Sequence, residues 1–325
     1  MLLLKDMKIG FIGLGRMGAN IVLHLLEGGI EVVAWNRSLE PREELRKEAL
    51  ELKTGSENLT IAESIDELVS NLEGSRTIWL MITAGEAVDA VITDLVSKID
   101  KGDLIIDGGN SFYQDSIRHG KELAGKGIHF MDVGTSGGVE SARHGACLMI
   151  GGSLEDFERA EPIFKAEAAA GGYGLLGEVG AGHFAKMIHN GIEYGMMEAI
   201  GEGAAILKNS QFNYDLRKVF QVYSVQSIIE SRLTGWTLAE LKNDPNLDNI
   251  SSVIGSAGGA GKTKGEGHWT VEIAKGMGID TPVIAASVAV RDNSDKDEEN
   301  SPNGFRNKIV AAMRWQFGRH PVKKS

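Results

Sequence analysis

The chain has 325 residues, of which 42 are glycine and only 6 are proline, and 42% of its residues are hydrophobic. This composition excludes a small disulfide scaffold, a collagen and a disordered proline-glycine chain, and it allows about two domains with sizeable cores. Lys and Arg number 34 against 45 Asp and Glu, a net charge of -11, which disfavours indiscriminate binding to nucleic acid or to an anionic membrane.

The apolar runs and the single cysteine indicate in which part of the cell the protein resides. Cys147 cannot form an internal disulfide, and its place in the apolar run 146–150 predicts a buried side chain rather than a nucleophile. The N-terminal apolar run 1–4 is too short for a signal peptide. No stretch approaches the roughly 20 apolar residues of a membrane span. We therefore expect a cytoplasmic protein.

Short apolar runs alternate with longer helical patterns over the first 180 residues. Residues 7–12 precede a glycine turn and a helical pattern that continues through Leu26, and residues 31–35 form the next expected strand. This alternation is typical of a doubly wound, mainly parallel sheet. The further strands expected are 77–82, 104–106, 130–133 and 148–150, and the helices expected between them are 86–99, 115–124 and 154–164.

After the glycine-rich stretch 171–182 the strand signals stop and helical patterns dominate. We therefore expect a domain boundary near residue 180, with an α/β domain over residues 1–180 and an all-α domain over residues 181–325. The acidic run 292–300 is typical of a solvated loop. The helices expected in the second domain are 183–207, 214–231, 282–290 and 305–317.

The first glycine turn has the pattern G-x-G-x-x-G, formed by Gly13, Gly15 and Gly18. It follows an expected strand and opens an expected helix, which is the context of a dinucleotide-binding Rossmann domain. The first glycine permits the turn, the second lets the backbone approach a pyrophosphate, and the third lets the helix pack on the strand. The residues predicted to bind the dinucleotide here are Gly13, Leu14, Gly15, Arg16, Met17 and Gly18.

The residue that ends the second expected strand is Asn36, followed by Arg37 and Ser38. An acid at this position would bond the ribose 2′-hydroxyl of NAD and repel the 2′-phosphate of NADP. Asparagine does not repel the phosphate, arginine can pair with it, and serine can donate a hydrogen bond. These residues favour NADP. An enzyme that also accepts NAD, or an exposed turn in which Arg37 has no ligand, would have the same sequence.

Four polar residues, Lys186, His189, Asn190 and Glu193, stand at i, i+3, i+4 and i+7 in an expected helix. This spacing places all four on one face. A merely solvated stripe is the alternative, and the apolar residues interleaved with the stripe argue against it. We therefore predict a functional face on this helix.

The run 186–197, KMIHNGIEYGMM, resembles the signature helix of decarboxylating 6-phosphogluconate dehydrogenases. The chain's length and the run 265–271 resemble the short form of that family, in which the helical domain is not duplicated. Other stretches match in the expected order: the Gly13 turn, 107–111 (DGGNS), 136–138 (SGG), and 317–320 (FGRH) with Arg314 ahead of it.

The resemblance implies oxidative decarboxylation of 6-phosphogluconate to ribulose 5-phosphate, a step of the pentose phosphate pathway. Oxidation at C3 places a carbonyl β to the carboxylate, so CO2 can leave without a metal, and the enediol then takes a proton. By this resemblance Lys186 exchanges the C3 hydroxyl proton and Glu193 protonates the enediol carbon. Asn190 and Asn110 would orient substrate hydroxyls, and His189 would assist at the reacting end.

A single helical domain would leave apolar helix faces that a second copy could cover, so we expect a homodimer or homotetramer. The same resemblance implies a C-terminal tail that reaches a neighbouring subunit, and it implies the remaining contacts. Ile82, Thr83, Ala84 and Asn110 would line the cofactor. Ser136, Gly137 and Gly138 would contact the substrate carboxylate. The candidates for binding the phosphate are Tyr194, Lys264, Arg291, Arg314 and His320.

Three positions depart from the pattern of the family. Glu266 stands where the long enzymes have threonine, and Lys264 stands where short forms often lack lysine. Short forms also commonly carry aspartate at the position of Asn36 and use NAD, whereas the local chemistry favours NADP.

Two other functions stay open. A β-hydroxyacid dehydrogenase of the 3-hydroxyisobutyrate or tartronate semialdehyde type shares the domain plan and a catalytic lysine, but typically shows K-x-x-N-N where this chain has His189-Asn190. A non-catalytic NADP-binding sensor is more remote, because Lys186 and Glu193 are present together.

Overall fold

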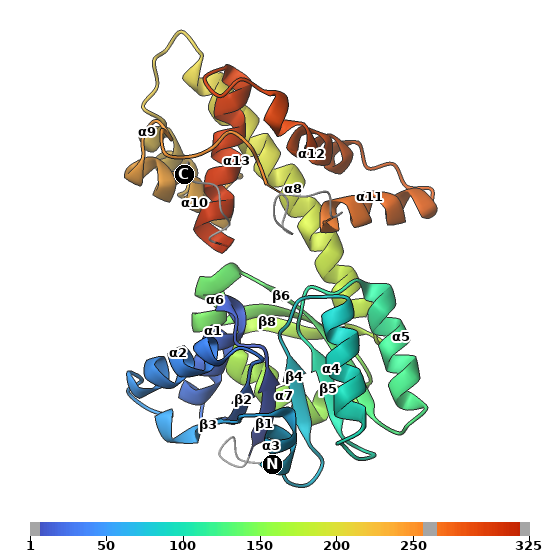
Figure 1. Cartoon of the computed structure of the whole chain (residues 1–325). Helices are drawn as coiled ribbons and strands as arrows, with labels where there is room; N and C mark the ends of the chain where they lie inside the picture. Colours follow the sequence, from blue (N-terminus) through green and yellow to red (C-terminus); the bar gives the residue numbers. More distant parts are fainter. Residues whose placement is uncertain (1–6, 256–264, 319–325) are drawn as a thin grey trace. The chain divides into compact units, whose positions relative to one another are not determined.

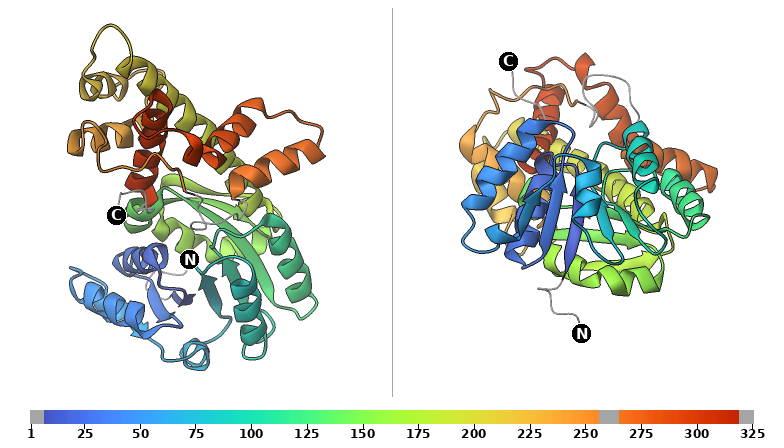
Figure 2. Two further views of the ribbon diagram at one scale, coloured as in Figure 1. Left: turned by 45° about the horizontal axis from the view of Figure 1, so that its top comes forward. Right: turned by 60° about the horizontal axis from the view of Figure 1, so that its bottom comes forward.

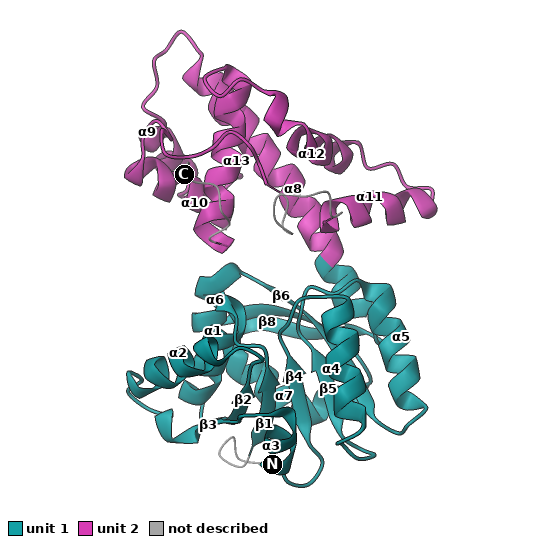
Figure 3. Ribbon diagram, in the orientation of Figure 1, with its two compact units in different colours: residues 1–186 teal, residues 187–325 magenta. Residues whose placement is uncertain are grey.

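The chain folds into two compact units, residues 1–186 and 187–325 (Figure 3). The computed structural model describes residues 7–255 and 265–318. Lys264 and His320, both predicted to bind substrate, lie outside the described residues. Within the described ranges, no helix is long and apolar enough to cross a membrane.

The first unit contains an eight-stranded sheet with the order β3-β2-β1-β4-β5-β6-β7-β8 (Figure 1). Neighbouring strands are parallel except β6 and β7, which pair antiparallel. The predicted doubly wound, mainly parallel sheet is thus confirmed. The strands are β1 (Lys8–Ile12), β2 (Glu31–Trp35), β3 (Leu59–Ile61), β4 (Thr77–Leu80), β5 (Leu104–Asp107), β6 (His129–Ser136), β7 (Ala146–Gly151) and β8 (Ala168–Gly177).

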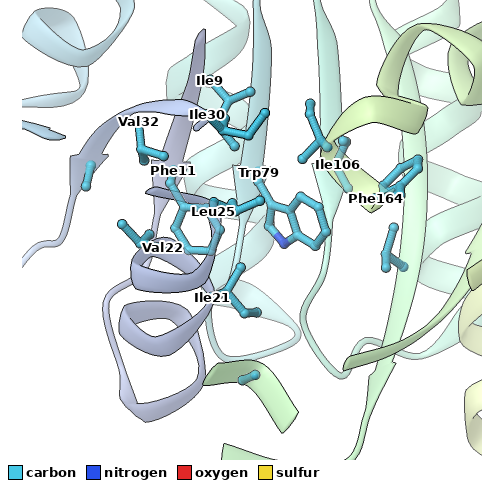
Figure 4. Packing of buried hydrophobic residues seen from close by; sticks show 14 of the residues in the cluster. Ile9, Phe11, Ile21, Val22, Leu25, Ile30, Val32, Trp79, Ile106 and Phe164 are labelled. Atoms are coloured by element: carbon cyan, nitrogen blue, oxygen red, sulfur yellow. The ribbon is translucent and has the colours of Figure 1, made fainter. Parts of the chain in front are cut away.

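Helices cover both faces of this sheet (Figure 2), because its central strands are apolar on both sides. On one face Phe11 stacks on Trp79 with 6.1 Å between ring centroids, and Trp79 meets Phe164 edge-on at 5.9 Å (Figure 4). Ile12, the next residue of β1, belongs to the opposite apolar layer. The helices are α1 (Arg16–Glu27), α2 (Leu39–Leu50), α3 (Ile65–Ser70), α4 (Glu86–Val96), α5 (Tyr113–Ala124), α6 (Gly138–His144) and α7 (Leu154–Glu167).

Two expectations for the first unit were wrong. No strand was expected between the helix 154–164 and the boundary near residue 180, but β8 spans Ala168–Gly177. As an edge strand β8 pairs only with β7, and its residues are half-buried or exposed, so they show no apolar run. Cys147 is exposed rather than buried. Side chains alternate along a strand, and its neighbours Ala146 and Leu148 take the buried face of β7.

The described residues of the second unit form helices and loops, which confirms the predicted all-α domain. Helix α8 begins in the first unit and continues into the second. The core gathers Met197, Phe220, Leu241 and Ile309 from different helices. The helices are α8 (Ala181–Lys208), α9 (Leu216–Tyr223), α10 (Arg232–Asn243), α11 (Glu266–Gly276), α12 (Pro282–Asp292) and α13 (Pro302–Gly318).

The helix expected over 214–231 is shorter than predicted. It ends at Tyr223, and Gln226 has a positive φ of 52°. Ser231 then begins α10 as its N-cap, with a capping box that pairs it with Thr234. Serine hydroxyls compete with helical hydrogen bonding and favour such caps, so the chain stops one helix and starts another.

The acidic run 292–300 lies between α12 and α13 and most of its residues are exposed, as the prediction of a solvated loop requires. Asp297 pairs with Arg306 at 3.0 Å, and Glu299 pairs with Lys308 at 3.3 Å. Both partners lie on α13, so ion pairs also fasten this loop to the helix.

Candidate active site

A glycine turn at the carboxyl end of β1 forms a cradle for a dinucleotide. Gly13 has a φ of +104°, and a Cβ there would lie 2.3 Å from the Met81 carbonyl oxygen. A Cβ on Gly18 would lie 2.0 Å from the Gly13 carbonyl oxygen, whereas one on Gly15 would meet nothing within 4 Å. The backbone therefore requires glycine at Gly13 and Gly18, and the surface over Gly15 is open.

The N-terminus of α1 is suited to an anion. Its N-cap is Gly15, which offers no capping side chain, and the first turn contains no acidic residue. The backbone N–H groups of such a turn favour negative charge, as does the helix dipole. The residues present thus fit the pyrophosphate of a dinucleotide.

The side chain of Asn36 forms hydrogen bonds with the backbone around the glycine turn. Its Oδ1 accepts a hydrogen bond from the Leu14 backbone N–H at 3.0 Å, and its Nδ2 donates to the Ser38 carbonyl oxygen at 3.2 Å. The side chain therefore ties the end of β2 to the glycine turn, a role that was not anticipated. Arg37 and Ser38 are both exposed.

Asp107 holds the loop that carries Asn110. Its carboxylate is fully buried, with Oδ1 accepting the Gly109 N–H at 3.0 Å and Oδ2 accepting the Ser111 hydroxyl at 2.7 Å. Asn110 itself is exposed. A Cβ on Gly109 would lie 2.9 Å from the Ile82 carbonyl oxygen, so this loop is next to the loop 82–84. The buried aspartate was not singled out, although its place at the end of a strand was a signal.

Asp132 of β6 anchors the first turn of α8. It is fully buried, Oδ1 accepts the Gly180 N–H at 2.6 Å, and Oδ2 accepts the His183 N–H at 2.7 Å. The His183 Nδ1 atom lies 2.7 Å from the Ser116 hydroxyl of α5. A carboxylate at a helix N-terminus accepts hydrogen bonds from the backbone N–H groups of the first turn, and the helix dipole stabilises its negative charge. Sequence reasoning missed both Asp132 and His183, because nothing local joins residues so far apart in the chain.

Lys186 follows His183 by one helical turn and packs on the same strand. A Cβ on Gly134, two residues beyond Asp132, would lie 2.4 Å from the Lys186 Cβ atom. Strand β6 thus caps α8 at Asp132 and supports the stem of Lys186 at Gly134. The loop after β6 turns at Gly137, with a φ of +118°, and Gly138, with a φ of +72°.

The predicted stripe lies on one unbroken helix, α8. His189 Nδ1 is 2.9 Å from Asn190 Oδ1 and 3.9 Å from Glu193 Oε2. The side chains of His189 and Glu193 are 39% and 22% exposed, so the stripe is neither a core face nor a fully solvated one. No group of three or more potential metal ligands occurs within residues 7–255 and 265–318.

Three of the predicted phosphate-binding residues come together within the second unit. Arg291 stacks over the Tyr194 ring, with 3.5 Å from Cζ to the ring centroid. The Arg314 guanidinium donates to the Gly255 carbonyl oxygen and interacts electrostatically with Arg291 and Tyr194. Burial lowers the pKa of Arg314 to about 10, and the nearby Arg291 charge lowers it as well. The Arg314 side chain therefore interacts with residues of its own chain.

Comparison with known proteins agrees with this arrangement. Residues 8–180 match the NAD binding domain of 6-phosphogluconate dehydrogenase, and residues 182–323 match the 6-phosphogluconate dehydrogenase C-terminal domain. The Bacillus subtilis (strain 168) protein named "Putative 6-phosphogluconate dehydrogenase YqeC" is 44% identical over 98% of this chain and 100% of its own length. The NAD(+)-dependent, decarboxylating 6-phosphogluconate dehydrogenase of Haloferax volcanii is 35% identical over 98% of this chain and 99% of its own length.

A solved structure of a 6-phosphogluconate dehydrogenase is also similar to this chain. The Plasmodium falciparum 6-phosphogluconate dehydrogenase, described with its cofactor NADP+ and its substrate 6-phosphogluconate, superposes with a TM-score of 0.78. Its sequence is 32% identical, and the match covers 94% of this chain and 70% of that one. The chain therefore belongs to the 6-phosphogluconate dehydrogenase family.

Proposed function

We propose that this protein catalyses the oxidative decarboxylation of 6-phosphogluconate to ribulose 5-phosphate and CO2. One observation carries the proposal: a single helix, anchored at Asp132, presents Lys186 and Glu193 on one face. They are separated by seven residues, or roughly 10 Å along the axis. The reaction needs two acid-base groups at different carbons of one sugar chain, and a rigid helix can supply both.

The proposed steps use these groups in turn. Lys186 takes the C3 hydroxyl proton, and the bound nicotinamide supplies the hydride acceptor. Lys186 then returns its proton to the C3 oxygen as the bond to CO2 breaks. Glu193 protonates the carbon that carried the carboxylate, and the enediol hydroxyl gives its proton back to Lys186 as the ketone forms. Protons and electrons balance, and no metal is needed.

Further residues have proposed positioning roles in this reaction. His189, Asn190 and Asn110 orient the sugar hydroxyls, and residues 136–138 receive the substrate carboxylate through backbone N–H groups. Tyr194, Arg291 and Arg314 bind the phosphate, a role that their burial as a cationic cluster supports. We assign cofactor binding to residues 1–180, and substrate binding and dimerisation to residues 181–325.

NADP is the cofactor we propose, with NAD as the alternative. The exposed Arg37 and Ser38 follow a side chain that carries no negative charge. Relatives of both kinds exist, since the Haloferax enzyme is named NAD(+)-dependent and the Plasmodium structure contains NADP+. The local chemistry of Arg37 supports NADP, because an arginine can pair with a 2′-phosphate.

A substrate comparison tests the proposal. Cofactor reduction is followed with 6-phosphogluconate, gluconate and 3-hydroxyisobutyrate, each with NADP and NAD, while released CO2 is trapped. We expect reduction and stoichiometric CO2 with 6-phosphogluconate and NADP. Reduction without CO2 would refute the decarboxylating step. Preference for 3-hydroxyisobutyrate would instead assign the protein to the β-hydroxyacid dehydrogenases.

A further inference from the structure

A buried serine hydroxyl links two segments of the second unit. Ser294 is the first residue of the short 3-10 helix Ser294–Lys296, which follows α12, and it is 2% exposed. Its Oγ atom accepts the Ile254 backbone N–H at 2.9 Å and donates to the Arg291 carbonyl oxygen at 2.8 Å. A hydroxyl can donate one hydrogen bond and accept another, so this side chain satisfies both backbone groups at once. Ser294 therefore joins the segment 251–255 to the C-terminal end of α12.

Each of the two linked segments holds one arginine of the predicted phosphate site. Arg291 lies on α12, three residues before Ser294. Gly255 follows Ile254, and its carbonyl oxygen accepts a hydrogen bond from the Arg314 guanidinium. We call Arg291 and Arg314 the arginine pair. The hydrogen bonds of Ser294 therefore connect the backbone of one member of the pair to the segment that binds the side chain of the other.

The arginine pair needs structural support because its two charges repel each other. Arg291 and Arg314 are 8% and 3% exposed. Burial lowers the pKa of Arg314 to about 10, and the charge of Arg291 lowers it as well. Two like charges that are removed from water stay close only where the surrounding structure holds them. The contacts of Ser294 and Gly255 supply part of this support, and the Tyr194 ring, over which Arg291 stacks at 3.5 Å, supplies another part.

Helix α13 also contacts both linked segments. Asn307 is fully buried, its Nδ2 atom donates to the Asp297 carboxylate at 3.0 Å, and the same atom lies 3.5 Å from the Ser294 carbonyl oxygen. Asn307 and Arg314 are seven residues apart on α13, so they lie on the same face of the helix. Helix α13 therefore meets the turn at Ser294 through Asn307 and the segment 251–255 through Arg314.

We propose that Ser294 is a positioning residue that holds Arg291 and Arg314 in a fixed relative position and thereby sets the affinity of the arginine pair for a phosphate group. Guanidinium groups bind phosphate strongly only when their N–H groups are aligned with its oxygens. Loss of the hydroxyl leaves the buried Ile254 N–H without its acceptor, so its segment shifts and Arg314 loses its fixed acceptor at Gly255. The identification of the ligand with the substrate phosphate rests on the proposed function, whereas the positioning rests on the hydrogen bonds alone.

Inorganic phosphate tests the role of Ser294 without turnover. Its affinity for the full-length protein is measured by titration calorimetry, and we expect Ser294→Ala to bind it about tenfold more weakly than wild type. Ser301→Ala is the matched control, because the Ser301 hydroxyl also accepts one backbone N–H, that of Gly304 at 3.0 Å, and donates to one carbonyl oxygen, that of Glu298 at 2.7 Å. This control should lower the melting temperature and leave phosphate affinity unchanged.

A double-mutant cycle separates positioning from a general loss of stability. Arg314→Gln should bind phosphate about tenfold more weakly than wild type, and adding Ser294→Ala should weaken binding further by about twofold or less, because the two residues act together. All these variants retain Lys264 and His320, so any contribution of those two residues is common to the proteins compared. If Ser294→Ala does not fold, Ser294→Cys replaces it, since a thiol keeps the size of the side chain and weakens both hydrogen bonds.

Turnover provides a second measurement, which depends on the proposed function. Ser294→Ala should raise the KM for 6-phosphogluconate about tenfold and change kcat by about twofold or less, because the phosphate is bound equally in the ground state and the transition state. A purely structural defect would instead reduce the amount of active enzyme, which lowers the apparent kcat and leaves KM unchanged.

Four results would overturn the inference: no phosphate binding by wild type, unchanged phosphate affinity in Ser294→Ala, unchanged affinity in Arg314→Gln, or additive effects of the two substitutions. The phosphate experiments require no turnover. A protein whose phosphate affinity responds as expected but that does not oxidise 6-phosphogluconate would refute the proposed function and leave the positioning role of Ser294 intact.

Discussion

The carboxylate of Asp132 accepts the backbone N–H of His183 at 2.7 Å, across 51 residues of sequence. This bond joins the sheet to the helix that carries the proposed catalytic stripe. Because Gly134 on the same strand contacts the stem of Lys186, the position of the proposed base depends on how α8 meets β6. We therefore propose that Asp132 is a positioning residue for Lys186.

Asp132→Asn should lower both stability and turnover. An amide retains one acceptor but turns a donor toward the other backbone N–H, and leaving that group unsatisfied costs about 1–3 kcal/mol. We expect a lower melting temperature, a reduced kcat, a shifted pH profile of kcat and an unchanged nucleotide affinity. Asp215→Asn, which alters the N-cap of α9, is the control and should affect stability only. A variant with normal kcat and pH profile would show that Asp132 does not position Lys186.

Glu193→Gln should abolish overall turnover and leave nucleotide affinity unchanged, because the proposed proton transfer follows hydride transfer. A single-turnover experiment should still detect reduced cofactor, while ribulose 5-phosphate formation falls by about 10²- to 10⁴-fold. Glu202→Gln, an exposed change on the same helix, is the matched control. Normal product formation by Glu193→Gln would mean that another group is the acid.

Asn36→Asp should shift cofactor preference toward NAD. A carboxylate can still accept the Leu14 N–H and loses only the bond that Nδ2 donates to the Ser38 carbonyl oxygen. The glycine turn should therefore stay tied to the end of β2 while the new charge repels a 2′-phosphate. We expect the ratio of kcat/KM for NADP to that for NAD to fall by about tenfold or more. Arg37→Ala should lower the same ratio by removing a cation. An unchanged ratio in both variants would contradict the assignment of NADP.

A buried pair in the first unit should make stability depend on pH. Glu167 is fully buried, its Oε2 lies 3.2 Å from His24 Nδ1, and burial raises the pKa of Glu167 to about 10. Burial also lowers the pKa of His24. Both directions favour a neutral pair, with the proton on the carboxyl group, over an ion pair.

Proton binding by Glu167 determines whether the free energy of unfolding rises or falls with pH. Above the unfolded pKa of about 4.5 the folded protein binds more protons at Glu167 than the unfolded chain does, so this residue reduces the free energy of unfolding as pH rises toward about 10. Glu167→Gln removes the titration, and we expect a higher melting temperature than wild type at about pH 8 and a flatter pH dependence. Glu161→Gln on the same helix is the control. Parallel curves for wild type and Glu167→Gln would contradict the neutral pair.

The sequence by itself determined the features that depend on neighbours along the chain. The glycine turn at Gly13, the alternation of strands and helices, and the spacing from Lys186 to Glu193 are all local patterns, and the fold class followed from them. The end of helix α9 and the edge strand β8 were missed, because a capping serine and an edge position change the pattern that burial normally leaves.

Only the tertiary structure decided how distant polar groups are paired. Asp132 with His183, Asn36 with Leu14, and Arg291 with Tyr194 each join residues from different elements. Such pairs have no periodicity, since each depends on which strand or helix packs against another. The free energy that holds a buried charge comes from these contacts, so the residues that tune the proposed site became visible only once the chain was folded.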